Sequence, residues 1–516
     1  MTLDRVVQEV QAAVEAIDWP RVVHLLGLHW SILLDEATDL LDSTLRVTPL
    51  SEFKGNPAAS AVRDIRLHAA ADTADQMLGK VSTTHLTDAS WFGPIARSDH
   101  ALPLLGAVAS RMIALRVRGE MSRAVELAAL VENLGRAAAV HNPELIGPRL
   151  PAALLQAGIT RGLADDLAGA TITLHDAYER APQSRVEYVA RDAAGKLALF
   201  LALAGDIDHA RTWLETADTA PQAHGWYRQR IALTMNTAKT LIAVESLDSE
   251  TADATVRLLN HSVNTEQGWG PAVTYAQTRY ALVWGDRRGA LKSVQQDRDR
   301  YADWLHVGTT MGPLLAQAEA ELRLSLGQTH RVLPVIADYA DHPVGEVVRG
   351  RLAFTDSDFA AALRLANAAL SSAFSSRIRA EALALLVLVR FYLQDDDLRR
   401  ACEELDATID ATGMTSARYT VHEEVRKEIG AGHEHPPHRT IRTLFPKPED
   451  IIRLSSRQRL VLDQLSLGLT LTEIAETQHL SYNTIKTHSQ ALYRRLGATS
   501  ADEAVARAYD AGLLSD

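Results

Sequence analysis

Cysteine is almost absent from this chain: its 516 residues include one, Cys402. A single thiol excludes an intrachain disulfide and a cysteine-rich zinc site, which favours a reducing compartment such as the cytoplasm. Cys402 follows an acidic turn within a helical pattern, and we expect it to be a small, buried filler of the core.

Long apolar runs are absent as well. The longest, residues 382–389, is far shorter than the roughly 20 residues needed to cross a bilayer. The opening residues, MTLDRVVQEVQAAVEAIDWP, are acidic and have no basic segment followed by an apolar stretch, so they do not predict a signal peptide. We therefore expect a cytoplasmic protein without a membrane partner.

Aromatic residues make up only 5% of the chain, whereas hydrophobic residues reach 47%, and the dominant segments are rich in Ala, Leu and Arg. A chain of this length can bury a large core and form several domains. The composition favours helices over sheets. We predict an all-α fold.

Motifs that bind nucleotides are missing. The phosphate-binding loop Gly-x-x-x-x-Gly-Lys-[Ser/Thr] does not occur, and its nearest matches, around Lys80 and Lys196, have neither the first glycine nor the hydroxyl residue. The alternating strand and helix pattern of a phosphate-receiver domain is also absent. We therefore predict that the chain is not an enzyme and binds no cofactor.

The densest group of possible metal ligands is the run AGHEHPPHRT, which contains His433, Glu434, His435 and His438. The later histidines follow His433 by two and five residues, whereas the zinc motif H-E-x-x-H needs four, and two prolines break the helix that would align the ligands. The run favours a histidine-rich linker, with weak adventitious metal binding as the alternative. We predict a linker over residues 430–452 and no metal site.

An excess of positive charge is missing too. The formal net charge is −12, and from Asp450 onward seven Arg or Lys residues face eight Asp or Glu residues. The C-terminal segment is thus near neutral, and the other 449 residues carry the remaining −11. Tight, non-specific binding to nucleic acid is not favoured by these numbers.

A short register recurs through residues 1–429. A Gly or Asp opens a turn, and an Ala five residues later begins the next helical pattern; the pairs are Gly119 and Ala124, Asp165 and Ala170, Gly205 and Ala210, Gly285 and Ala290, Asp356 and Ala361, and Asp396 and Ala401. Their intervals of 46, 40, 80, 71 and 40 residues are mostly near one or two units of about 40. Because Gly or Asp permits a tight reversal and Ala permits close helix packing, the register predicts stacked antiparallel helix pairs, an α-solenoid.

This region resembles the tetratricopeptide-like arrays of MalT-type and other large LuxR regulators, although the unit exceeds 34 residues and the W-x-x-L-G-x-x-Y signature is absent. A HEAT-like or unclassified solenoid stays open. The resemblance implies a sensor surface for an unknown ligand or protein. The tryptophans Trp226, Trp269, Trp284 and Trp304 favour packing between repeats, with an aromatic-lined cavity as the alternative.

The last 60 residues divide into four short helical segments with clear start signals. Capping boxes are predicted at Ser455 with Gln458, at Thr470 with Glu473 and at Ser500 with Glu503. The third segment begins at Ser481 and stops at Gly497. We expect helices at about 456–466, 471–478, 482–496 and 501–511. A short helix, a tight turn over residues 479–481 and a longer helix form the layout of a helix-turn-helix.

Residues 453–516 closely resemble the LuxR or GerE-like family. The resemblance is carried by Leu454, Ser455, Ser456 and Arg457, by Gly468, Leu469 and Thr470, by Glu473, Ile474 and Ala475, by Thr484, Ile485, Lys486 and His488, and by Leu496, Gly497, Ala504 and Val505. Gln458 and Leu471 depart from the family pattern. The resemblance implies a four-helix, DNA-binding output domain of a transcriptional regulator.

The third segment carries the candidate DNA-binding residues. A step of about 100° per residue places Asn483, Thr487, Gln490 and Arg494 on one stripe, opposite Ile485, Leu492 and Leu496. By resemblance to the family, Lys486, Thr487 and Gln490 contact bases in the major groove. Ser481 and Thr484, at the helix start, suit phosphate, and Arg494 adds charge near the DNA backbone.

In the family the fourth helix supplies a dimer contact, which makes Val505, Ala508 and Tyr509 candidates; packing within one domain is the alternative. We therefore predict double-stranded DNA as a partner, a homodimer on DNA, and RNA polymerase as a further candidate partner. A helical-repeat adaptor whose C-terminal domain binds protein is the competing function.

Overall fold

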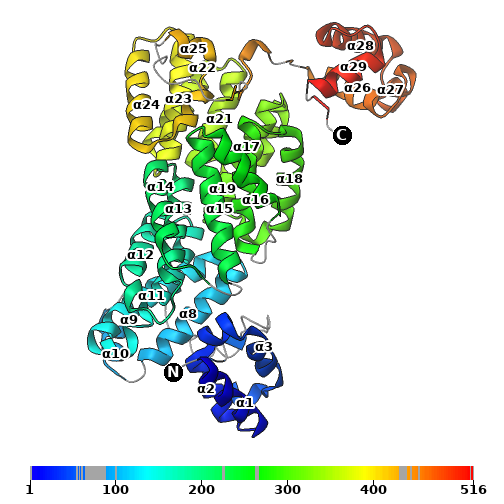
Figure 1. The fold of residues 1–516 in the computed structure, drawn as a ribbon. Coiled ribbons are helices and arrows are strands. Elements are labelled where there is room, and N and C mark those ends of the chain that lie inside the picture. Colours follow the sequence, from blue (N-terminus) through cyan, green and yellow to red (C-terminus); the bar gives the residue numbers. More distant parts are fainter. Residues whose placement is uncertain are drawn as a thin grey trace.

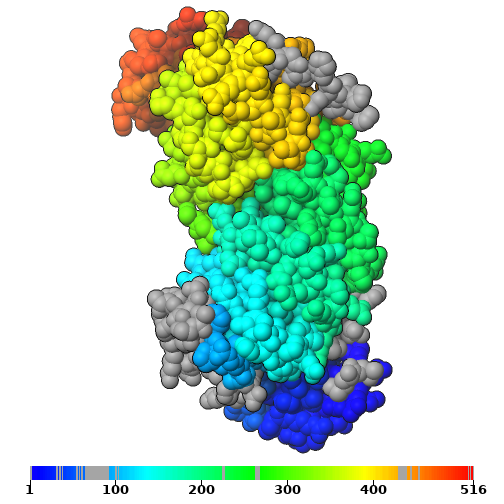
Figure 2. All heavy atoms as spheres, turned by 90° about the vertical axis from the view of Figure 1, so that its left-hand side faces the viewer, coloured from blue at the N-terminus to red at the C-terminus, as the bar shows by residue number. Residues whose placement is uncertain are grey.

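The computed structural model describes residues 3–53, 56, 59, 62–63, 89–98, 101–223, 227–261, 267–428, 439–441, 444–450, 452, 454–511 and 513–514. These residues form helices and no strand, which confirms the all-α prediction. Figure 1 shows a long column of helices with a small helical domain at one side. The C-terminal domain lies at the same end of the molecule as the last helices of the column (Figure 2).

The N-terminal helices form a small core of their own. They are α1 (Leu3–Glu15), α2 (Trp19–Glu36), α3 (Thr38–Val47) and α4 (Leu50–Phe53). Val6, Val10 and Leu26 are fully buried within this cluster, which is separate from the main core. The side chain of Asp18 caps α2 by accepting a hydrogen bond from the Arg21 amide at 3.3 Å.

The column is an array of consecutive helix pairs. After α7 (Ala89–Ala96), its helices are α8 (Ala101–Val117), α9 (Met121–His141), α10 (Pro143–Ile146), α11 (Leu150–Leu163), α12 (Leu167–Glu179), α13 (Val189–Ala204), α14 (Ile207–Thr219), α15 (Tyr227–Glu245), α16 (Ser249–His261), α17 (Gly270–Val283), α18 (Arg287–Arg300), α19 (Met311–Ser325), α20 (Val332–Val335), α21 (Pro343–Thr355), α22 (Phe359–Ser371), α23 (Ser376–Leu393), α24 (Leu398–Thr412) and α25 (Glu423–Glu428). Short 3-10 turns join them at η2 (Ala181–Gln183), η3 (Gln267–Trp269), η4 (Ala302–Trp304), η5 (Thr329–Arg331), η6 (Ala337–Tyr339) and η7 (Thr415–Thr420).

The predicted turns fall between paired helices. Gly119, Asp165 and Gly205 have φ of 80°, 60° and 85°, the left-handed conformation that reverses the chain. The alanine five residues after each of them, Ala124, Ala170 or Ala210, is fully buried. A small side chain at that position lets the second helix pack closely against the first.

Two turns differ in register from the prediction. The left-handed residue is Ser357 and not Asp356, so the buried alanine is Ala362, while Ala361 is only half-buried. In the last pair the left-handed residue is Gln394, two positions before Asp396. At Gly285 φ is not positive, and Ala290 is half-buried.

One copy of the register escaped the sequence pattern. Leu247 has φ of 63° and is followed five residues later by the fully buried Ala252, between α15 and α16. This turn lies 42 positions after Gly205, because 247 minus 205 is 42. It divides the interval of 80 residues that the prediction left as two units.

One continuous core runs through the array from α9 to α25. Trp269 and Trp304 are buried in it, which confirms that they pack between repeats, whereas Trp226 lies outside the described residues. Cys402 is half-buried against the core, and burial, with Asp406 and Glu403, raises the pKa of its thiol to about 11. Leu444 and Phe445, from the predicted linker, also belong to this core.

The C-terminal domain has a separate core built from four helices. After η8 (Pro448–Asp450), these are α26 (Ser456–Ser466), α27 (Leu471–Thr477), α28 (Tyr482–Leu496) and α29 (Ala501–Asp510). The domain contacts the array near α18 and η5, where Arg288 Nη2 donates to the Tyr509 carbonyl at 2.8 Å. A second contact joins Arg459 Nη2 and His330 Nδ1 at 3.2 Å.

Candidate nucleic-acid interface

Helix α28 is fixed at both ends by its own sequence. The Ser481 hydroxyl accepts a hydrogen bond from the Thr484 amide at 3.1 Å, and Gly497 closes the helix in the left-handed conformation with φ of 67°. His479, with φ of 53°, reverses the chain between α27 and α28. The turn and both ends of the third predicted helix are thus confirmed.

Capping boxes hold the first two helices of the domain. Ser455 with Gln458 and Thr470 with Glu473 each make both reciprocal bonds, as predicted. The third box differs: Ser500 accepts from the Glu503 amide, but the Glu503 carboxylate accepts from the Thr499 amide, at 2.7 Å. These bonds hold the pKa of Glu473 and Glu503 below its usual value.

One face of α28 is buried in the domain and the opposite face is exposed. The inner residues Ile485, Ser489, Leu492 and Leu496 are buried, and they pack with Val461, Leu462 and Leu465 of α26 and Ile474 and Ala475 of α27. Leu460 and Leu480, also predicted to face this core, are half-buried. A helix held in this way presents a rigid outer surface.

The outer face contains the predicted contact residues. Ser481, Lys486, Thr487, Gln490 and Arg494 are exposed in the full chain, and Thr484 is half-buried. The array therefore does not cover this face, and the helical-wheel prediction is confirmed. Asn483 and Arg495, which the predicted site did not include, are exposed on the same helix.

Charge on α28 is of one sign. Lys486, Arg494 and Arg495 lie on it, and no Asp or Glu occurs between Thr477 and Ala501. Neither Lys486 nor Arg494 has an ion pair with a described acidic side chain. The acidic residues of the domain lie instead at helix starts, as Glu473 and Glu503 do. Near neutrality of the whole segment thus conceals a basic helix, a segregation that the summed charge of the segment did not reveal.

The predicted dimer residues are divided by burial. Ala508 is fully buried in the domain core and offers no surface in the single chain, so Val505 and Tyr509, both half-buried, are the candidates that stay. The Tyr509 carbonyl is bonded to Arg288 of the array. Dimerisation through α29 stays a prediction.

The geometry is that of a helix-turn-helix with an exposed basic second helix. Residues 453–508 match the family model described as GerE, bacterial regulatory proteins of the luxR family. The C-terminal domain is of the LuxR type. The match covers α26, α27, α28 and most of α29, and it supports a DNA-binding role in transcription regulation. No curated protein matches the chain.

Other candidate sites outside the LuxR-type domain give no catalytic or metal centre. Lys196 is buried and pairs with Asp192 at 2.5 Å, so it is a core residue. The histidine run with His433, Glu434, His435 and His438 lies outside the described residues. No group of potential metal ligands occurs among the residues that are described, and none of their helices is long and apolar enough to span a membrane.

Proposed function

We propose that this protein is a sequence-specific, DNA-binding transcriptional regulator whose helical array senses a ligand or protein partner. The observation that supports it is the outer face of α28, which is polar, basic and exposed in the full chain. A major groove accepts such a helix, and the face meets it without any rearrangement of the domain.

Three side chains at the middle of this face would read bases. Lys486 suits guanine, Gln490 suits adenine, and Thr487 offers a methyl group and lone pairs because its hydroxyl donates to the Asn483 carbonyl at 2.9 Å. Ser481 and Thr484 lie at the helix start, where backbone amides attract phosphate. Arg494, one helix end away, adds charge beside the DNA backbone.

Regulators of this design act as dimers on DNA. Two LuxR-type domains related by a two-fold axis would bind half-sites about 34 Å apart. Val505 and Tyr509 on α29 are the proposed contact, and RNA polymerase is a further candidate partner. A cytoplasmic location follows from this function.

The test replaces Lys486, Thr487 and Gln490 together with Ala. We expect loss of the sequence-specific footprint on genomically selected DNA, with unchanged helicity by circular dichroism because all three side chains are exposed. Asp502→Ala, which changes an exposed residue on α29, is the matched control and keeps the footprint. An unchanged footprint in the triple variant would remove these residues from the site.

A helical-repeat adaptor is the second candidate, favoured by the near-neutral charge of the segment as a whole. A salt titration separates the two. Each phosphate contact adds about −0.9 to the slope of log affinity against log salt, so three to five contacts give a slope of roughly −3 to −5. A slope near zero for the captured partner would favour the adaptor.

A further inference from the structure

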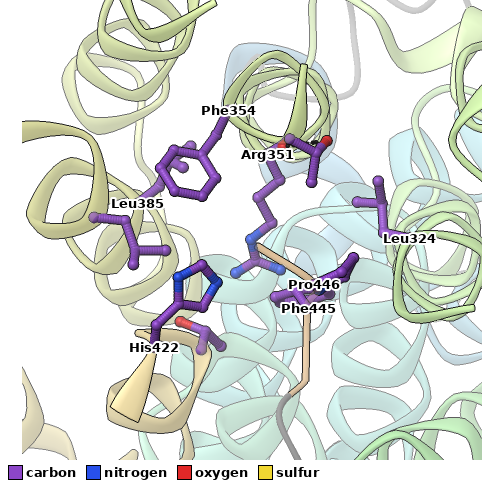
Figure 3. Close-up of a pocket in the computed structure, with 10 residues that line it drawn as sticks. Leu324, Arg351, Phe354, Leu385, His422, Phe445 and Pro446 are labelled. Carbon is purple, nitrogen blue, oxygen red and sulfur yellow. Dashed lines mark hydrogen bonds between the residues drawn. The ribbon is translucent and has the colours of Figure 1, made fainter. Parts of the chain in front are cut away.

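A small pocket lies where the linker to the LuxR-type domain crosses the end of the array. Its apolar walls are Leu324 of α19, Phe354 of α21, and Leu385 and Leu388 of α23. Phe445 and Pro446 of the linker close it (Figure 3). The free space is about 10 Å³, which admits about one water molecule.

Arg351 points into this pocket with half of its guanidinium unpaired. Its Nη1 forms an ion pair with Glu321, whereas Nη2 is buried and has no hydrogen-bond partner among the described residues. The guanidinium carbon lies 4.6 Å from the centroid of the Phe445 ring. A stacked ring covers the charge but does not satisfy the N–H groups.

His422 faces the same space from the other side (Figure 3). It is 2% exposed, and neither Nδ1 nor Nε2 has a hydrogen-bond partner among the described residues. Burial lowers its pKa, which keeps the ring neutral, and a neutral ring offers one N–H donor. Two buried donors are therefore left without acceptors, at a cost that an acceptor ligand would remove.

Positive charge prevails behind the pocket. Arg351 shares Glu321 with Arg279, which also pairs with Glu245, and Glu245 pairs in turn with Arg377. The remaining carboxyl of this buried network is Glu381, and burial, with the nearby Glu321, raises its pKa towards the neutral form. Three arginines then face two ionised carboxylates, which favours an anion at Arg351.

The hydroxyls that line the pocket are already used. Thr355 and Thr420 each donate to a backbone carbonyl of their own segment at 2.7 Å. The site therefore offers two donors, from Arg351 and His422, within an otherwise apolar wall. A carboxylate has two oxygens for two donors, whereas a phosphate would bring more charge than these groups neutralise.

We propose that this pocket binds a small organic acid, with its carboxylate on Arg351 and His422 and its apolar chain in the place now held by Phe445. Binding displaces the ring and frees the linker to the LuxR-type domain. The inference rests on the sensing part of the proposed function and gives the sensor a site and a ligand class.

Hexanoate is the probe, titrated calorimetrically into the full-length chain. We expect Phe445→Ala to bind it at least about tenfold more tightly than the unmodified chain, because the competing ring is gone. Adding Arg351→Lys to that variant keeps a cation for Glu321 but removes the second donor, and it should abolish the gain. Phe374→Ala, which truncates an exposed ring on the array, is the matched control and leaves binding unchanged.

His422→Leu in the Phe445→Ala background is a second variant, useful if Arg351→Lys does not fold. Loss of its N–H should weaken hexanoate about tenfold, while burial of Leu in place of an unpaired ring keeps the fold. Equal hexanoate affinity in Phe445→Ala and the unmodified chain, or full affinity after both donor changes, would overturn the proposal.

Release of the linker has its own readout. Trypsin should cut after Lys447 faster when hexanoate is added to the unmodified chain, and hexanoate should have no such effect on Arg351→Lys. The DNA footprint of ligand-free Phe445→Ala is measured in parallel. A retained footprint without hexanoate binding removes only the ligand site, whereas hexanoate binding without any footprint removes only the DNA function.

Discussion

Glu245 shows what the array demands of single side chains. It is fully buried, and it pairs with Arg279 at 3.1 Å and with Arg377 at 2.7 Å. Burial alone would raise its pKa, but the two arginines and the Ser416 hydroxyl hold it at about 2. Since this folded-state value lies below the ordinary 4.5, the stability that Glu245 contributes is complete above pH 4.5 and is lost as the pH falls towards 2.

Replacing Glu245 with Gln should therefore be costly, because it leaves two buried guanidinium groups short of a partner. We expect the free energy of unfolding of the array to fall by about 3–5 kcal/mol, measured as a shift of its urea transition. Glu403→Gln is the control, since its ion pair with Arg399 is exposed and contributes less than about 1 kcal/mol. Equal shifts in both variants would contradict the role given to burial.

At the level of helices, local sequence explains most of the positions of turns and ends. The caps at Ser455, Thr470 and Ser481 fall where their hydroxyl groups predicted them, because a cap depends only on residues three positions apart. The turn at Leu247 could not be predicted in this way. Leucine disfavours a left-handed backbone, and its place is fixed by burial between α15 and α16.

The linker shows the same limit. Its Gly, Pro and His content predicted a tether, and nothing local indicates that Phe445 packs against Arg351, 94 positions earlier, since 445 minus 351 is 94. The basic face of α28 was predictable because it depends on helical periodicity alone. The pocket was not, because it depends on contacts between distant pairs.

The left-handed turns make a paired prediction. Gln394 is exposed with φ of 54°, so Gln394→Gly should relieve strain and stabilise the array by about 1 kcal/mol. Gly205→Ala should destabilise it, because φ is 85° and the added Cβ would lie 2.6 Å from the Arg377 amide nitrogen. Thermal unfolding followed by circular dichroism measures both, and shifts of the same sign would contradict this account.

Across the whole molecule, the array and the LuxR-type domain meet at a titratable contact. His330 Nδ1 must be unprotonated to accept a hydrogen bond from Arg459. Burial and the charges of Arg459, Arg331 and Arg323 lower the pKa of His330 to about 4. Because the docked value is below the ordinary 6.5, docking is favoured above pH 6.5 and weakens as the pH falls towards 4.

Acidification should therefore release the LuxR-type domain. We expect the radius of gyration from small-angle X-ray scattering to rise between pH 7 and pH 5 in the unmodified chain. In His330→Gln, whose amide oxygen accepts from Arg459 at any pH, the rise should vanish. His209→Gln, an exposed histidine on α14, is the control and should keep it. An identical expansion in all three proteins would exclude His330 as the cause.

The burial of Phe445 also limits how far the LuxR-type domain can search. Nine residue steps separate Phe445 from Leu454, and a fully extended chain covers at most about 3.6 Å per step, or roughly 32 Å. If the ring is released, the anchor retreats to Glu428 at the end of α25, and 26 steps reach roughly 94 Å. The accessible volume grows as the cube of that ratio, about 25-fold, so the local concentration of the domain around its own array falls by the same factor. Seating or freeing one aromatic ring thus changes the radius within which a paired half-site can be found.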